Sequence, residues 1–232
     1  MTNADILMQE ALQLFQPVLA CRNWAPVERI GEEKFVCNVA ELSHPCLVFS
    51  IGSFNDYSFE DTVLQQTPCQ VHTFDCTVEG HSVDNSRHVY HKQCIGSNAQ
   101  AAADDRFVTI SQAVSNVGAS KLHLLKMDIE AFEWDVISGW RESDTFLPDQ
   151  ISFELHRSDV SPSEWPLYIN KVRSKDSDPL HWQGAHAMSV AHTSLLFMHL
   201  ANLGYGLVAK EANGECCSEF TVLRVGNIRH YG

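Results

Sequence analysis

Two side chains near the middle of the chain, Glu154 and His156, could together transfer a proton. They are two residues apart in the run Gln150–His156, which is predicted to be a strand, so both side chains point to the same face. A carboxylate beside an imidazole can remove a proton from a substrate hydroxyl or amine. Asp128, at the end of the run Lys121–Met127, is expected next to them on the neighbouring strand. We therefore predict a catalytic group in which His156 is the base and Glu154 orients it.

The same three side chains have two other interpretations. They could hold a divalent cation, which would act as a Lewis acid and lower the pKa of a bound hydroxyl. Alternatively, Glu154 and His156 could form a salt bridge that closes the end of the sheet. We therefore predict no residue as a metal ligand, and a bound divalent cation remains an alternative.

A second candidate group follows the apolar run Cys46–Ile51. Gly52 would let the backbone approach a cofactor closely, and Ser53 and Asn55 could hydrogen-bond to its polar end. Ser50, inside the run, belongs to the same predicted site. A single glycine also fits an ordinary turn, so this segment needs support from elsewhere in the chain.

Asp75 gives that support, because it follows Gly52 by about 23 residues and ends the predicted strand Gln70–Phe74. An acidic residue in this position can accept two hydrogen bonds from ribose hydroxyls. A turn or cap aspartate is the alternative. Ile95 and Gly96, at the end of the next predicted strand, and Asp128 complete the predicted cofactor site.

Short apolar runs alternate with amphipathic segments, a pattern that predicts a parallel sheet. The expected strands are Cys46–Ile51, Gln70–Phe74, His88–Ile95, Lys121–Met127 and Gln150–His156. The expected helices between and after them are Ser58–Gln66, Ser111–Val117, Glu130–Gly139 and His192–Leu203. Tyr205–Lys210 and Phe220–Val225 are expected to form a final antiparallel pair.

These elements predict one α/β domain over residues 1–232, with a Rossmann-like, doubly wound, mostly parallel sheet and a C-terminal antiparallel strand pair. Residues 1–35 are expected to form a helical extension that includes a helix over Ala4–Gln16. Residues 157–190 are rich in proline and polar residues and are expected to form a loop or insert near the site.

The composition narrows the choice of partners. The formal net charge is −13, and the Lys and Arg residues are scattered, so nucleic acid is not an expected partner. No run of about 18 apolar residues is present, so no transmembrane segment is predicted. The expected location is the cytoplasm, with a removed secretory leader as the alternative. The eight cysteines include no C-x-x-C pair and fit either disulfides or buried thiols.

The segment Lys126-Met127-Asp128-Ile129-Glu130-Ala131-Phe132-Glu133 resembles the K-I-D-V-E-G-x-E signature of FkbM-type methyltransferases. Residues 48–60, 71–77 and 152–156 fall at the matching places in order. Leu203-Gly204-Tyr205 and residues 216–220 resemble the carboxyl end of the methyltransferase-like branch found in animals and algae. The resemblance covers roughly residues 36 to 225.

This resemblance implies a class I methyltransferase that uses S-adenosylmethionine (SAM). The resemblance says little about the acceptor, which we predict to be an oxygen, less favourably a nitrogen, of a small molecule or a glycan-like compound. Ala131 stands where the family has glycine, and a loop with one glycine replaces the usual glycine-rich loop, which leaves a non-catalytic SAM-binding or scaffold homologue as an alternative. A nicotinamide-dependent oxidoreductase is a further alternative, although the G-x-G-x-x-G motif is missing.

Overall fold

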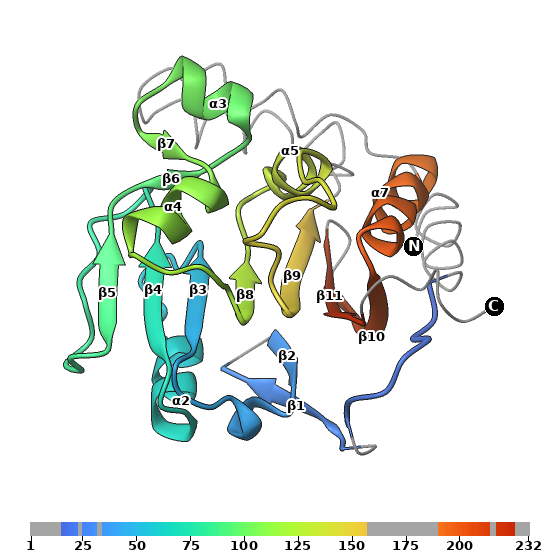
Figure 1. Ribbon diagram of the computed structural model, residues 1–232, viewed down its shortest axis with the longest axis horizontal. Coiled ribbons are helices and arrows are strands. Elements are labelled where there is room, and N and C mark those ends of the chain that lie inside the picture. The colour runs from blue at the N-terminus through green and yellow to red at the C-terminus, as the bar shows by residue number, and fades with distance from the viewer. Residues whose placement is uncertain (1–14, 23–24, 32–33, 157–189, 214–216, 226–232) are drawn as a thin grey trace.

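The computed structural model describes residues 15–22, 25–31, 34–156, 190–213 and 217–225 (Figure 1). Its centre is a seven-stranded sheet with the order β10-β11-β9-β8-β3-β4-β5. The strands are β3 (Leu47–Ile51), β4 (Gln70–Phe74), β5 (His88–His91), β8 (Leu124–Met127), β9 (Gln150–His156), β10 (Tyr205–Asn213) and β11 (Cys217–Arg224). From β5 to β9 neighbouring strands are parallel, whereas β11 runs antiparallel to both β9 and β10.

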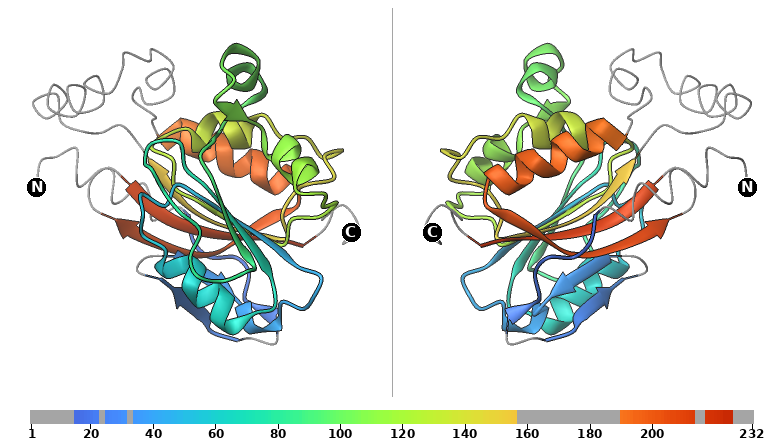
Figure 2. Two further views of the ribbon diagram at one scale, coloured as in Figure 1. Left: turned by 90° about the vertical axis from the view of Figure 1, so that its left-hand side faces the viewer. Right: turned by 90° about the vertical axis from the view of Figure 1, so that its right-hand side faces the viewer.

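The central strands are covered on both faces. Every residue of β3 and β8 is buried, which explains why these segments are mostly apolar and do not alternate between apolar and polar residues. The helices α4 (Ile110–Asn116), α5 (Glu133–Ser138) and α7 (Val190–Asn202) lie on one face (Figure 2). On the other face lie α2 (Ser58–Gln66) and a hairpin of β1 (Val27–Ile30) and β2 (Lys34–Cys37).

The order of the strands reverses beside β3. The chain runs outward from β3 to β4 and β5, and then returns to β8 on the other side of β3. Ligands of open α/β sheets bind at the carboxyl ends of the strands where the order reverses in this way. The loops after β3 and β8 therefore lie side by side at this point.

The structure confirms the predicted mostly parallel sheet and its C-terminal antiparallel pair, but it changes the predicted strand at residues 88–95. That strand ends at His91, and β6 (Cys94–Ile95) pairs instead with β7 (Phe107–Val108) in a separate sheet. A disulfide from Cys76 to Cys94 joins β6 to the end of β4. A short helix, α3 (Asn98–Ala103), lies between β6 and β7.

The predicted helix from Glu130 begins later, at Glu133. Glu130 and Ala131 have φ angles of 55° and 78°, which are left-handed values that a right-handed helix cannot contain. Ala131 therefore occupies a conformation that favours glycine, and glycine is the residue that the resembled signature has at this place.

The amino-terminal region also differs from the helical extension expected over residues 1–35. Its described part contains β1 and the beginning of β2, followed by a short 3₁₀ helix, η2 (Val39–Glu41). The predicted helix over Ala4–Gln16 falls almost wholly outside the described residues, as does the predicted insert over 157–190. The expectation of one domain over the whole chain stays a prediction.

Three disulfides connect neighbouring elements: Cys21–Cys37, Cys46–Cys69 and Cys76–Cys94. Cys217, the first residue of β11, is also disulfide-bonded. Among the described residues, no helix is long and apolar enough to cross a membrane.

Candidate functional site

The loop after β3, residues 52–56, is called the cofactor-side loop below. Gly52 has a φ of +77°, and a Cβ on it would lie 1.7 Å from the carbonyl oxygen of Asp128. The ammonium of Lys126 donates a hydrogen bond to the Gly52 carbonyl from the other side. Glycine is thus required because the loop is pressed against the chain that leaves β8.

Asp75 holds the cofactor-side loop in shape. Its Oδ2 accepts hydrogen bonds from the backbone N–H groups of Ser53, at 3.0 Å, and Phe54, at 2.8 Å. Its Oδ1 accepts from the N–H and hydroxyl of Thr77, at 2.8 and 2.7 Å. A carboxylate offers about four lone pairs, so a ribose hydroxyl would have to displace one of these bonds.

Three other predicted cofactor residues are less accessible. Ser50 is 0% exposed inside β3, and its hydroxyl lies near the buried carboxyl of Glu60. Ile95 belongs to the main hydrophobic core, and a Cβ on Gly96 would meet the ring of Phe107. The prediction for Ser50 stays a prediction, and its buried side chain leaves only the backbone of Ser50 for a contact with a ligand.

In contrast, the outer part of the cofactor-side loop faces solvent. Asn55 is exposed, and Phe54 is 74% exposed. Both residues have left-handed φ angles, which turn their side chains outward at the carboxyl end of the sheet. Ser53 lies beneath them, and its hydroxyl accepts the N–H of Asn55 at 3.4 Å.

The second group of predicted residues does come together in the structure. We define the acceptor-side cluster as Asp128, Glu130, Glu133, Glu154 and His156. The His156 Nε2 atom lies 3.8 Å from Asp128 Oδ1, 3.7 Å from Glu130 Oε2 and 3.7 Å from Glu154 Oε2. Its other ring nitrogen, Nδ1, lies 3.1 Å from Glu133 Oε1. One imidazole is therefore surrounded by four carboxylates.

The connection from β8 to α5 positions Asp128, Glu130 and Glu133. Asp128 directly follows β8, and the left-handed backbone at Glu130 and Ala131 turns the chain into α5. Glu133 is the first residue of α5, and its Oε1 accepts the N–H of Ile129 at 2.7 Å. This bond satisfies a backbone group at the beginning of the helix.

The carboxylates determine the charge of His156. Burial alone would lower the pKa of His156, but Glu133, followed by Glu130 and Asp128, outweighs burial and raises that pKa to about 10. Such an imidazole is protonated near neutral pH and donates hydrogen bonds. The role of His156 as a base stays a prediction, and the raised pKa means that His156 would act as a base only after it has lost this proton.

The pKa values of Glu154 and Asp128 are also shifted by burial and by the neighbouring charges. Burial raises the pKa of Glu154 to about 7, and the charge of Asp128 adds to this effect. Burial would also raise the pKa of Asp128, but Lys126 and Lys34 hold it below its ordinary value.

Lys34 is a functional candidate that the sequence did not indicate. It comes from β2, is 4% exposed, and its ammonium lies 3.2 Å from Asp128 Oδ2 and 2.5 Å from Glu219 Oε1. Glu219 belongs to β11. These residues are far apart in the chain, so no spacing pattern could have connected them.

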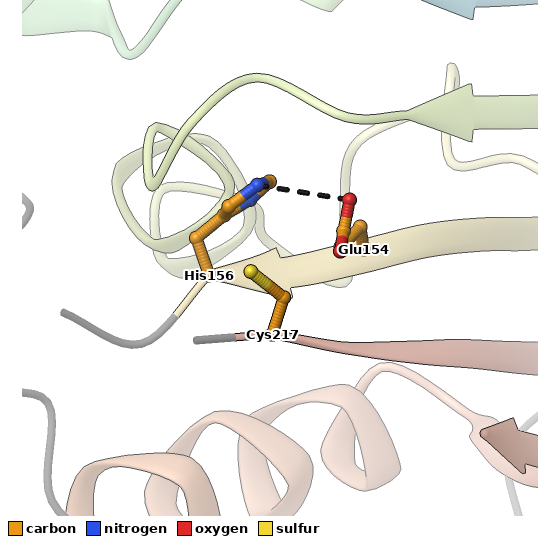
Figure 3. A group of neighbouring side chains, drawn as sticks. All are labelled: Glu154, His156 and Cys217. Carbon is orange, nitrogen blue, oxygen red and sulfur yellow. Dashed lines mark ion pairs between the residues drawn. The ribbon is translucent and has the colours of Figure 1, made fainter. Parts of the chain in front are cut away.

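Among the described residues, two groups of side chains lie close enough to bind a metal ion. The first is Glu154, His156 and Cys217, shown in Figure 3 with the Cys217 sulfur of β11 beside the two side chains of β9. Cys217 is disulfide-bonded, so it cannot supply the thiolate that a metal requires. The second is Asp128, Glu133 and His156, in which one ligand atom from each residue lies within 4.8 Å of the others.

Comparison with known proteins adds an independent observation. A family model described as a methyltransferase domain matches residues 3–214. The probable methyltransferase-like protein 24 of Homo sapiens is 28% identical over 154 residues, which cover 59% of this chain and 42% of that protein. The Rattus norvegicus protein of the same name is 24% identical over the same coverage. The matched region thus spans less than half the length of these curated relatives.

Solved structures also resemble the chain. The antibiotic-resistance methyltransferase Kmr is 13% identical, with 86% of this chain and 100% of that chain covered and a TM-score of 0.41. A SAM-dependent methyltransferase from Aquifex aeolicus is 8% identical, with 80% and 86% covered and a TM-score of 0.35.

Proposed function

Because the chain belongs to the methyltransferase domain family, we propose that it transfers a methyl group from SAM to an oxygen, in preference to a nitrogen, of a small-molecule or glycan-like acceptor. The family match confirms the methyltransferase predicted from the sequence and disfavours the nicotinamide-dependent oxidoreductase. The narrower FkbM assignment stays a prediction. The observation that carries the proposal is that the acceptor-side cluster meets the cofactor-side loop where the strand order reverses.

The residues of the cofactor-side loop fit SAM. Gly52 has no space for a side chain, so a cofactor could approach the loop backbone closely. The exposed Asn55 and the nearby Ser53 offer polar atoms for hydrogen bonds to the cofactor. We assign Gly52, Ser53 and Asn55 to the amino-acid end of the cofactor, and Ile95 and Gly96 to the edge of its base. Asp75 would act mainly by holding the loop, through its bonds to the Ser53 and Phe54 amides.

SAM, when bound, supplies an electrophilic methyl group, and the protein must position the acceptor and take up its proton. We assign these tasks to Asp128, Glu154 and His156. Asp128 lies next to the Gly52 backbone and therefore between the two sides of the site. Glu154 shares one face of β9 with His156 and takes the acceptor proton, while the cationic imidazole holds the carboxylates in place.

The charge of the site favours an acceptor without phosphate groups. Asp128, Glu130, Glu133 and Glu154 converge on one imidazole, and the whole chain carries a formal charge of −13. A phosphate-rich polymer would be repelled by such a surface. A neutral hydroxylated acceptor avoids this repulsion.

We also propose an oxidising compartment for this protein, in place of the cytoplasm expected from the sequence. The disulfides Cys21–Cys37, Cys46–Cys69 and Cys76–Cys94 join separate elements, and such bonds persist in oxidising environments. Mass spectrometry of the native protein after alkylation without reductant tests this proposal. Alkylated Cys46 and Cys69 would contradict it.

The methyltransferase proposal is tested with the disulfide-intact protein in two steps. Calorimetry with SAM and with NAD measures cofactor binding, and transfer of a labelled methyl group is then measured on panels of glycans, hydroxylated small molecules and amines. We expect SAM binding without NAD binding, and label on a hydroxylated acceptor. Failure to bind SAM would reject the proposal, and SAM binding without transfer to any acceptor would favour the non-catalytic homologue.

A further inference from the structure

We propose that Asp128, Glu133 and His156 bind one divalent metal ion at the carboxyl ends of β8 and β9. One ligand atom from each of these residues lies within 4.8 Å of the other two, so small side-chain movements would bring all three to a common ion. The binding of the ion does not depend on methyl transfer. Its task in holding an acceptor rests on the proposed function.

Glu133 provides the strongest observation. Its side chain is 0% exposed, and its Oε1 is used by the Ile129 N–H and by His156 Nδ1. Its Oε2 is buried and has no hydrogen-bond partner among the residues that the structure describes. Burying a carboxylate oxygen without a partner is costly, and a cation between Glu133 and its two neighbours would remove that cost.

Asp128 and His156 can complete the site once the ion has displaced a ring proton of His156 to solvent, because only a neutral imidazole has a lone pair for a metal. Asp128 points Oδ2 at the Lys34 ammonium, 3.2 Å away, and Oδ1 at His156 Nε2, 3.8 Å away. One carboxylate oxygen is thus fixed by a buried lysine, while the other faces the imidazole. This division leaves Oδ1 directed toward the space that the ion would occupy.

The surrounding charges favour a doubly charged ion. Glu130 and Glu154 both lie 3.7 Å from His156 Nε2, in addition to the three proposed ligands. They are placed to accept hydrogen bonds from water molecules bound to the ion, an arrangement common around metal sites. Carboxylates therefore outnumber cationic side chains around His156, and a divalent ion reduces this imbalance.

The ligand types indicate which ion to test. Two carboxylates and one imidazole form a mixed oxygen and nitrogen set without thiolate, because the Cys217 sulfur is held in a disulfide. Such a set suits Mn²⁺, which accepts both hard oxygen and imidazole ligands. Bound beside Glu154, the ion would hold an acceptor hydroxyl and lower its pKa as a Lewis acid.

The test is a titration of the EDTA-treated, disulfide-intact protein with Mn²⁺ alone, followed by electron paramagnetic resonance. We expect one ion per chain. Glu133→Gln and Asp128→Asn, which keep the side-chain shapes, should each weaken Mn²⁺ binding by about 10-fold or more. The matched control is Glu79→Gln, because Glu79 is an exposed carboxylate paired with Lys92 and lies outside the cluster; it should bind as the unmodified protein does.

Absence of Mn²⁺ binding in the unmodified protein would overturn the inference, as would equal binding in all three variants. If both cluster variants fail to fold, broadening of the His156 ring resonances by Mn²⁺ in the unmodified protein decides: localised broadening supports the site and its absence rejects it. SAM binding is measured on the same preparations. SAM binding without Mn²⁺ binding rejects only the metal site, and the reverse result rejects only the proposed function.

Discussion

The cofactor-side loop and the acceptor-side cluster lie next to each other, but only in the loop do the described residues satisfy the hydrogen bonds of the polar groups. In the loop, Asp75 accepts hydrogen bonds with both of its oxygens, and Lys126 donates to the Gly52 carbonyl. In the cluster, four carboxylates surround His156, and the buried Oε2 of Glu133 has no hydrogen-bond partner within the described part of the chain. The loop is preorganised by its own chain, whereas the cluster gains most from a ligand.

This difference follows from where the groups originate. The loop is held by side chains at the ends of β4 and β8, the two strands on either side of β3. The cluster and its counter-charge Lys34 come from β2, the β8–α5 connection and β9. The cofactor-side loop is held in one shape before the cofactor binds, which suits a ligand that always binds in the same orientation. The acceptor-side cluster has more carboxylates than cationic side chains, which suits the removal of a proton from the acceptor.

The largest expected effect comes from a change that disturbs both regions, Gly52→Val. Its Cβ would lie 1.7 Å from the Asp128 carbonyl oxygen, at a φ of +77°. We expect a loss of about 3 kcal/mol or more in the free energy of unfolding, together with loss of SAM binding. Chemical denaturation and calorimetry measure the two effects.

Gly118→Val is the matched control for this change. Gly118 has a similar φ of +71°, but nothing lies within 4 Å of a Cβ placed on it. Its cost should be limited to backbone strain of about 1 kcal/mol. Equal destabilisation by the two changes would contradict the close contact between the loop and β8.

The second prediction separates the regions by function. His156→Ala should lower turnover by about 10²-fold or more while SAM affinity stays nearly unchanged, because the change removes the group that holds the carboxylates of Glu133 and Glu154. Steady-state kinetics and calorimetry measure these quantities. His44→Ala, at an exposed site outside the cluster, should change neither. Full turnover in His156→Ala would leave His156 as a structural residue.

The third prediction concerns Asp75 and has a smaller effect. Asp75→Ala should weaken SAM binding by about 1 to 3 kcal/mol. Because Asp75 bonds to the Ser53 and Phe54 amides, the variant should also unfold more easily without the cofactor. A weaker affinity with unchanged stability would instead indicate that Asp75 acts through the ribose.

The smallest expected effect comes from His72, a buried histidine whose pKa is lowered, in contrast to the raised pKa of His156. Burial, with His91 and His88 nearby, lowers the pKa of His72 to about 4 from 6.5. A lowered histidine pKa contributes stability that is present above pH 6.5 and is lost as the pH falls toward 4. We expect a loss of about 1 to 2 kcal/mol near pH 4.5, measured by urea denaturation. His72→Gln should flatten this pH dependence; an unchanged pH profile would show that His72 does not cause it.

The sequence predicted the parallel strands and the polar residues that follow them. The strand that ends before Asp128 is mostly apolar, and a strand that is buried on both faces of a sheet favours such a composition. The positions of Gly52, Asp75, Asp128, Glu154 and His156 near strand ends follow from the same local pattern. These features depend on residues close together in the chain, so the sequence alone determined them.

The charges and partners of those residues were decided only by the tertiary structure. Lys34 reaches Asp128 and Glu219 from the β1–β2 hairpin, which lies on the face of the sheet opposite to α5. Glu133 reaches His156 because the residues with left-handed φ angles before it delay the beginning of α5. A pKa depends on the distance and burial of every neighbouring charge. Those distances exist only after segments far apart in the chain have packed together, and for this reason the raised pKa of His156 could not be predicted from its neighbours in the sequence.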